Sequence, residues 1–222
     1  MSLVRLRFVL LLALVPAGNA GASSIDFDAT SPGTLPAGWA SAQTRSGAAP
    51  RWQVLADPTA PSRPNVLAQL SQDRTAGRFP LAIYQPVTIR DGELSVRFKP
   101  VSGQVDQAAG LVWRYRDAGN YYLVRANALE NNVVLYKVEN GERTSIPPED
   151  RASRSYGVKH VVPSRTWSEL KVVFSGAAAT VYLNGERLFA THDNTFLAPG
   201  KIGLWTKADS VTYFDHFSFT GK

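Results

Sequence analysis

Three cationic side chains are the residues of this chain best suited to grip a sugar. Arg114 lies in GLVWRYR, Arg125 in YYLVRA and Lys137 in NVVLYKV, and each has aromatic residues beside it. Aromatic rings stack on the apolar faces of sugars, while guanidinium and ammonium groups donate hydrogen bonds to hydroxyl or carboxylate oxygens. If the three segments are neighbouring strands, the three cations converge on one sheet face. The alternative is a solvated outer face, on which long cationic side chains cover apolar surface.

A short polar segment near the C-terminus extends this candidate site. Trp205 directly precedes residues 206–210, which include Lys207 and Asp209. The segment joins two aromatic-rich runs, so we expect a turn between the last two strands that projects at the rim of the domain. Trp205 is then a candidate for stacking on a sugar, with Lys207 and Asp209 as contacts at the rim. The alternative for Trp205 is a position in the core.

The carboxylates and histidines show no pattern of a known catalytic or metal site. Glycosidic cleavage needs two carboxyl groups ~5–9.5 Å apart, and acids that alternate along one strand would share a face. No E-x-D-x-E string occurs, and the close acid pairs are Asp91/Glu93, Glu149/Asp150 and Asp26/Asp28. The histidines are isolated, and no cysteine is present as a nucleophile or zinc ligand. Whether the chain is an enzyme stays open; a glycoside hydrolase is the expectation if it is one.

The rest of the sequence predicts the strands that must position these residues. Period-two patterns rich in Val, Ile, Tyr, Phe and Trp recur at short intervals, and helical periodicity is nearly absent. Asp91-Gly92, Asn140-Gly141 and Asn184-Gly185 mark tight turns. About ten strands without crossover helices predict an all-β fold, an antiparallel sandwich or barrel.

The first 22 residues are typical of a secretory signal peptide. Arg5 and Arg7 precede the apolar run 8–15, and small residues follow, with cleavage expected after Ala20 or Ala22. No segment is long and apolar enough to span a membrane. Residues 23–222 are then a single exported domain, periplasmic or extracellular. Without the signal the formal charge falls from +6 to +4, and the scattered basic residues argue against nucleic-acid binding.

Five segments give the chain a family resemblance. They are spread from Ile25 to Phe219, over nearly the whole mature chain, and read IDFDATSPGTLPAGW, AAGLVWRYRDAGNYYLVRAN, NVVLYKVENGER, WSELKVVFSGAAATVYLNGERL and GKIGLWTKADSVTYFDHFSF. They resemble secreted bacterial domains of the concanavalin A-like lectin/glucanase fold, in the laminin-G-like branch and near the 3-keto-disaccharide hydrolase domains. The resemblance implies a jelly roll of two curved antiparallel sheets, with ligands bound on the concave face.

The resemblance also implies a place for a structural calcium ion. In relatives, an Asp near the start of the last strand helps to hold calcium beside the N-terminal segment, and Asp215 matches that position, with Asp28 expected near it. Calcium takes roughly six to eight oxygen ligands, many of them carbonyls and waters. The alternative is that Asp215 anchors the terminal loop by accepting hydrogen bonds from backbone N–H groups. No cofactor is required in either case.

Three functions remain open on the sequence. The first is an exported carbohydrate-binding domain with its ligand on the concave face. The second is a glycoside hydrolase acting on modified disaccharides or glycans. The third is a non-catalytic structural or protein-interaction module. A carbohydrate is the expected partner in the first two, and the sequence leaves the oligomeric state open.

Overall fold

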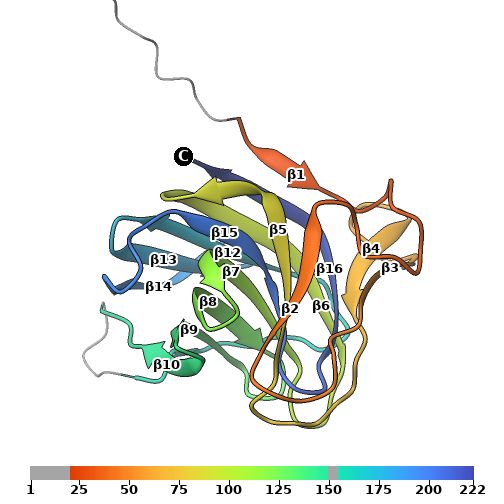
Figure 1. The fold of residues 1–222 in the computed structure, drawn as a ribbon. Coiled ribbons are helices and arrows are strands. Elements are labelled where there is room, and N and C mark those ends of the chain that lie inside the picture. The colour runs from red at the N-terminus through yellow and green to blue at the C-terminus, as the bar shows by residue number, and fades with distance from the viewer. Residues whose placement is uncertain (1–20, 150–154) are drawn as a thin grey trace, which may run out of the picture.

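A computed structural model of the protein describes residues 21–149 and 155–222. The regular secondary structure of these residues consists of β-strands, arranged in two antiparallel sheets (Figure 1). This confirms the prediction of an all-β sandwich. Within the described residues no helix could cross a membrane. The predicted signal sequence up to residue 20 and Asp150 of the Glu149/Asp150 pair lie outside them.

One sheet, called sheet A, has eight strands and contains both ends of the described domain. Its order is β14 (Glu186–His192), β13 (Ala178–Leu183), β12 (Ser168–Ser175), β6 (Gly92–Ser102), β16 (Val211–Gly221), β4 (Asn65–Gln69) and β3 (Trp52–Ala56), with β1 (Ser23–Ile25) paired to β16. The long strand β16 pairs with β6, β4 and β1. The N- and C-terminal strands are therefore hydrogen-bonded neighbours.

The other sheet, called sheet B, also has eight strands and carries the predicted ligand residues. Its order is β10 (Glu142–Ile146), β9 (Asn132–Glu139), β8 (Asn120–Asn127), β7 (Ala108–Asp117), β15 (Gly200–Trp205), β5 (Phe79–Ile89) and β2 (Trp39–Thr44), with β11 (Val158–Lys159) paired to β9. The three segments that carry Arg114, Arg125 and Lys137 are thus neighbouring strands, as expected.

The main core lies between the two sheets. Leu111, Trp113, Val124 and Leu135 point from sheet B into it, and the Trp113 ring stacks on Phe174 of β12 at a centroid distance of 5.6 Å. These positions follow the period of two that the sequence shows. Burying each such side chain contributes roughly 1.5–3 kcal/mol, so this layer holds the sheets together without a disulfide.

The opposite face of sheet B is also apolar and buried. It carries Phe79, Leu81, Val112, Leu123, Tyr136 and Trp205. The edges of the sheet meet across this face: Thr44 at the end of β2 donates to the carbonyl of Ala118 (2.5 Å), and Arg45 donates to the carbonyl of Gly141 (3.1 Å) beside β10. This is therefore the concave face, and its own rim covers it. The alternating residues of β7, β8 and β9 therefore form two buried faces, and the alternative of a solvated outer face is wrong.

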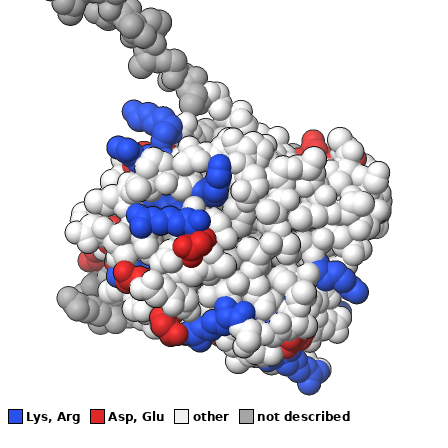
Figure 2. Space-filling view, viewed as in Figure 1, with Lys and Arg blue, Asp and Glu red and all other residues white. Residues whose placement is uncertain are grey.

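Charged side chains are spread over the surface. On the face in view, Lys and Arg lie beside Asp and Glu and form no single block (Figure 2). The mixture matches the scattered charges of the sequence.

Candidate functional site

The structure divides the predicted cations between the two faces of sheet B. Lys137 lies opposite Tyr122 in the β8–β9 pair, whereas Arg125 lies opposite Val134. Arg125 is three residues from Tyr122, and alternation along a strand places it on the other face. Arg114 has φ +49° at an irregularity of the β7–β8 pairing, and its guanidinium lies over the Phe174 ring of sheet A. The expected convergence of Arg114, Arg125 and Lys137 on one face does not occur.

Arg125 belongs to a group of polar side chains at one end of the concave face. We call this group the rim network; it consists of Asp106, Arg125, Asn127, Glu130, Asn132 and Lys207. Its members come from the loop before β7, the end of β8, the β8–β9 turn, the start of β9 and the β15–β16 turn. Four of them, Asp106, Arg125, Asn127 and Asn132, are buried. The concave face is thus apolar along most of these strands and polar at their ends.

Arg125 is the centre of the rim network. Its Nη1 and Nη2 donate to the two carboxylate oxygens of Glu130 at 3.1 and 2.8 Å, and Nη2 also donates to Asn132 Oδ1 at 2.5 Å. Asn127 Nδ2 donates to Asp106 at 2.6 Å and to Glu130 at 3.1 Å. Lys207 Nζ lies 2.5 Å from Asp106 Oδ2. A guanidinium and an ammonium thereby hold two carboxylates close together.

The two carboxylates of the rim network have opposite pKa shifts. Burial raises the pKa of Asp106, and the hydrogen bond and charge of Lys207 only partly offset it. For Glu130, burial also raises the pKa, but the hydrogen bonds and charge of Arg125 outweigh it and the pKa is lowered. The side chain of Glu130 is 38 % exposed, whereas that of Asp106 is 1 % exposed. The difference follows from this contrast in exposure and from the bidentate partner of Glu130.

Two guanidinium nitrogens at the rim network have no hydrogen-bond partner among the residues that the structure describes. Arg125 is fully buried, yet its Nε makes no hydrogen bond, and neither does the buried Nη1 of Arg143. Both cations lie over the ring of Tyr136, Arg125 at 5.6 Å and Arg143 at 4.4 Å from its centroid. Trp205 is also fully buried and lies beneath Arg143, 5.8 Å from it. Buried donors are normally satisfied, so these atoms mark a place where further acceptors would be stabilised.

Exposed apolar side chains lie in the loops around the rim network. Of the five large hydrophobic side chains exposed in the described residues, Val105, Leu129, Tyr156 and Val161 belong to the loops around it. Val105 adjoins Asp106, and Leu129 adjoins Glu130 in the β8–β9 turn. His160, next to Val161, donates its backbone N–H to the carbonyl of Asn131 in that turn, and the Tyr156 and Tyr136 hydroxyls are in contact. Polar groups and apolar surface therefore meet at this end.

Asp209 supports the rim network from behind. Its carboxylate accepts the backbone N–H groups of Gln104, Val105 and Asp106 at 2.7–3.2 Å. Burial raises the pKa of Asp209, but these hydrogen bonds outweigh it and lower the pKa overall. Residues 206–210 connect β15 to β16 as predicted, with the Ser210 N–H donating to the Lys207 carbonyl at 3.0 Å. Asp209 thus holds the loop that carries Asp106.

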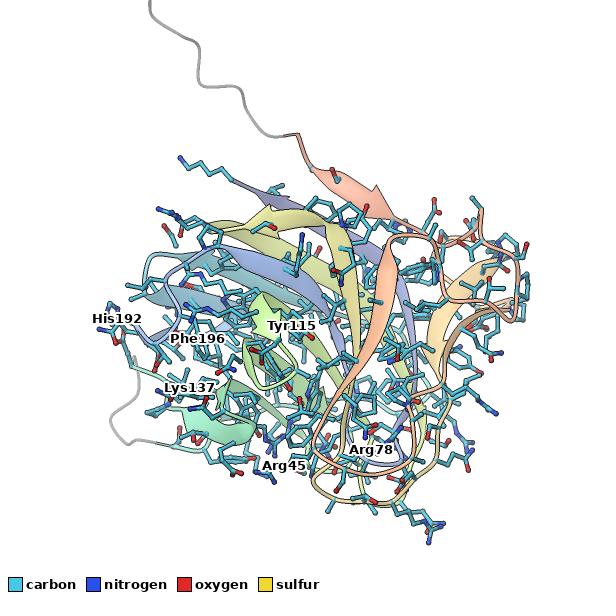
Figure 3. All side chains as sticks on the ribbon, in the orientation of Figure 1. Arg45, Arg78, Tyr115, Lys137, His192 and Phe196 are labelled. Carbon is cyan, nitrogen blue, oxygen red and sulfur yellow. The ribbon has the colours of Figure 1, made fainter. Side chains whose placement is uncertain are left out.

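Arg114 and Lys137 lie in a second polar region, on the face that meets sheet A. We call it the Tyr122 cluster; it consists of Arg114, Tyr122, Lys137, Asp193, Thr195 and Phe196. Figure 3 shows Lys137 and Phe196 close together at the left, apart from Arg78 near the bottom of the view. Tyr122 donates its hydroxyl proton to Asp193 (2.6 Å) and accepts the N–H of Phe196 (3.0 Å). Lys137 Nζ donates to Thr195 at 2.7 Å.

Every nitrogen of the Arg114 guanidinium has a protein acceptor. Nε and Nη2 donate to the Arg90 carbonyl at 3.0 and 2.9 Å, and Nη1 donates to the Phe196 carbonyl at 2.6 Å. Nη2 also lies 3.3 Å from Asp91. The side chain is 2 % exposed. Arg114 therefore ties the β5–β6 turn to the loop before β15.

The two predicted calcium ligands are occupied by hydrogen-bond donors. Asp215 accepts the N–H and hydroxyl of Ser62 and the N–H of His216, each at 2.7 Å. Asp28 accepts the N–H of Asn65 at 2.9 Å. In the described part of the chain no three His, Cys, Asp or Glu side chains gather as a metal site. The hydrogen bonds match the alternative in which Asp215 anchors the terminal loop, and calcium binding here stays a prediction.

Asp106, Asn127, Glu130 and Asn132 were not among the residues expected from the sequence. Three of them, with Arg125, lie in the string RANALENN around the β8–β9 turn. Asn, Asp and Glu near a turn are usually read as turn formers. The missing signal was Arg125 itself: a buried cation needs an acid, and Glu130 is the nearest acid in sequence.

Comparison with known proteins supports the fold. The sequence matches no family model and no curated protein. The carbohydrate-binding module CBM66 from Bacillus subtilis superimposes with a TM-score of 0.60 at 20 % identity, over 83 % of this chain and 96 % of that one. Cellulose-induced protein Cip1 gives 0.61 at 13 % identity, over 90 % and 97 %. The fold is that of the concanavalin A-like and galectin-like sandwiches.

The same sandwich also occurs as part of a larger enzyme. Xylan β-1,4-xylosidase from Bacillus halodurans C-125 matches with a TM-score of 0.56 at 17 % identity, over 95 % of this chain but 41 % of that one. At these identities the similarity establishes architecture. The narrower placement near laminin-G-like and 3-keto-disaccharide hydrolase domains stays a prediction.

Proposed function

We propose that this protein is an exported carbohydrate-binding domain that holds a glycan at the rim network of its concave face. The observation that carries the proposal is the buried guanidinium of Arg125, which has an unpaired Nε within a network of amides and carboxylates. Sugar hydroxyls both donate and accept hydrogen bonds, and such a mixed set suits them. The structural similarity to the carbohydrate-binding module CBM66 and to a protein with a galectin-like fold adds support at the level of the fold.

Each predicted ligand residue has a separate part in this proposal. Glu130 and Lys207 are partly exposed and contact the sugar hydroxyls. Arg125 orients Glu130 from below, and Asp209 positions the loop with Asp106. Trp205 forms the floor beneath Arg143, and the exposed ring of Tyr156 offers a stacking surface. Arg114 and Lys137 stabilise the fold in the Tyr122 cluster.

Glycan binding is tested first with immobilised hexasaccharides of xylose, glucose, galactose, fructose and galacturonic acid, and then by calorimetry with any that bind. We expect Lys207→Met and Glu130→Gln each to weaken binding about tenfold or more, because each removes a charge-assisted hydrogen bond. Lys201→Met, at the opposite end of β15, and Glu93→Gln, on sheet A, are the matched controls and retain the affinity. A panel in which nothing binds would contradict the proposal.

A glycoside hydrolase is the second candidate, and one observation favours it. Asp106 and Glu130 both accept hydrogen bonds from Asn127 Nδ2, so the accepting oxygens lie within ~6 Å, near the spacing of retaining glycosidases. Their pKa values are shifted in opposite directions, as an acid and a nucleophile require. The burial of Asp106 is the obstacle. Release of reducing sugar that is lost in Asp106→Asn and Glu130→Gln, but not in Glu93→Gln, would establish it.

A further inference from the structure

We propose that a cleft next to the rim network, formed around Arg74 and Arg51, binds a carboxylate-bearing unit of the glycan, so that the ligand is an acidic polysaccharide. This inference rests on the proposed function and names its ligand class. What we call the arginine cleft consists of two hollows that are both lined by Gln72. One, of 160 Å³, is lined by Gln72, Arg74, Ser102, Gly103, Gln104 and Asp209. The other, of 420 Å³, is lined by Ala49, Arg51, Leu70, Ser71 and Gln72.

The acids near the arginine cleft are engaged with the backbone rather than with the arginines. The oxygens of Asp209 accept three backbone N–H groups, and Arg74 Nε approaches one of them only to 4.0 Å. Asp73 accepts the N–H groups of Ala48 and Thr75, and these bonds lower its pKa to about 2. Arg51 makes a single long contact, 3.5 Å to the Leu70 carbonyl. Two guanidinium groups thus keep donors free for an anion.

The remaining lining of the cleft suits sugar hydroxyls. The side chains of Gln72, Ser102 and Gln104 make no hydrogen bond to any described residue. The smaller part, at 160 Å³, is far larger than the ~10–15 Å³ that one water needs, so it has room for sugar hydroxyls. Arginine pairs with carboxylates through two parallel hydrogen bonds. A uronic acid offers both the carboxylate and the hydroxyls that this lining can bind.

The cleft and the rim network are two sides of one loop. Residues 103–104 line the cleft, Asp106 belongs to the rim network, and Asp209 binds the backbone between them. Lys207 and Asp209 lie in the same β15–β16 turn and face one site each. A chain of sugars that crosses this loop therefore meets Glu130 and Lys207 first and Arg74 next.

The test compares hexagalacturonate with its methyl ester, which has the same backbone without the charges. Binding to the full protein is measured by calorimetry at low salt. We expect the acid to bind at least tenfold more tightly than the ester. Arg74→Gln should weaken binding of the acid about fivefold and of the ester less than twofold, and Arg51→Gln should add to this effect. Arg90→Gln is the control, because Arg90 follows β5 at its far end and is exposed.

Four results would overturn the inference. Equal affinities for acid and ester show that no carboxylate is read. Equal losses in Arg74→Gln and Arg90→Gln show a general charge effect instead of a site. Binding of a neutral hexasaccharide alone leaves the proposed function standing and removes the acidic ligand, whereas failure of every glycan removes both.

Discussion

The rim network and the Tyr122 cluster use the same kinds of residue on the same strands with different results. Each has a buried arginine on β7 or β8 and a partly buried acid, Glu130 in the β8–β9 turn and Asp193 directly after β14. In the Tyr122 cluster, all three nitrogens of Arg114 donate to protein oxygens. In the rim network, Arg125 keeps Nε unpaired, and its partner Glu130 is 38 % exposed. The two regions therefore differ in the pairing of their arginine, while both reach the surface, one through Lys137 and Asp193 and the other through Glu130.

The pairing of the buried arginine distinguishes structural from ligand-binding polar groups in one sandwich. A buried charge that is fully paired fixes the position of the loops around it and has little left to offer a ligand. A buried charge with an unpaired donor, next to exposed acids and apolar side chains, retains capacity to bind. By this criterion Arg125 belongs to the candidate site, and Lys207 is joined to it through Asp106 and Asn127. Arg114 belongs to the scaffold, together with Lys137, which pairs with Thr195 and Asp193.

The largest effect should come from Arg114→Met. The variant leaves the carbonyls of Arg90 and Phe196 without their donors and removes the partner of Asp91, so we expect a loss of about 3 kcal/mol or more in the free energy of unfolding. Chemical denaturation measures it. Glycan affinity of the folded fraction should stay within twofold. A loss of affinity without a loss of stability would reverse the roles that we assign to the two regions.

Arg125→Met should give the opposite balance. Glu130 can be hydrated once its partner is gone because it is partly exposed, so the expected stability loss is smaller, about 1–3 kcal/mol. Glycan binding should fall by more than tenfold, since Glu130 loses its orientation. Arg125→Lys keeps the charge but not the bidentate geometry and should recover stability more than binding. Recovery of both in equal measure would argue for a purely structural Arg125.

The sequence predicted the sandwich because alternation and turn residues are local signals. The turn pairs at Asn140-Gly141 and Asn184-Gly185 lie between β9 and β10 and between β13 and β14, as expected. It was harder to predict on which face of sheet B each cationic side chain lies. The irregularity at Arg114 shifts the register locally, and alternation alone cannot reveal it. Glu130 and Asp106 come together only through Asn127, across the β8–β9 turn and a separate loop, and no sequence spacing encodes that contact.

The contributions of Asp193 and Asp106 to stability should change with pH in opposite directions. Burial raises the pKa of Asp193, but hydrogen bonds from Thr195 and Tyr122 outweigh it and lower it below 3.8. Its stabilising contribution is therefore present above pH 3.8 and lost as the pH falls below it. Burial raises the pKa of Asp106 above 3.8, so its contribution is greatest when it is protonated and declines as the pH rises through the raised pKa.

Melting temperatures of Asp193→Asn and Asp106→Asn between pH 3 and pH 7 test both signs. Relative to the parent protein, Asp193→Asn should lose stability progressively as the pH rises from 3, and Asp106→Asn should gain. Parallel curves for the two variants would mean that Asp106 is not held in a desolvated site. The predicted difference in pH dependence between the two regions would then be wrong, although the geometry of the hydrogen bonds would be unchanged.

The smallest effect should come from removing calcium. Asp215 already accepts three hydrogen bonds, from Ser62 and His216, and Asp28 accepts one from Asn65. A calcium ion would have to displace donors that satisfy a buried carboxylate, which costs the energy of those bonds. We therefore expect the same melting temperature in EDTA and in millimolar calcium, while Ser62→Ala lowers it because it removes one of the donors. A rise with calcium that disappears in Asp215→Asn would show that the carboxylates at the N-terminal segment rearrange around an ion, and it would add a third polar region to the two compared above.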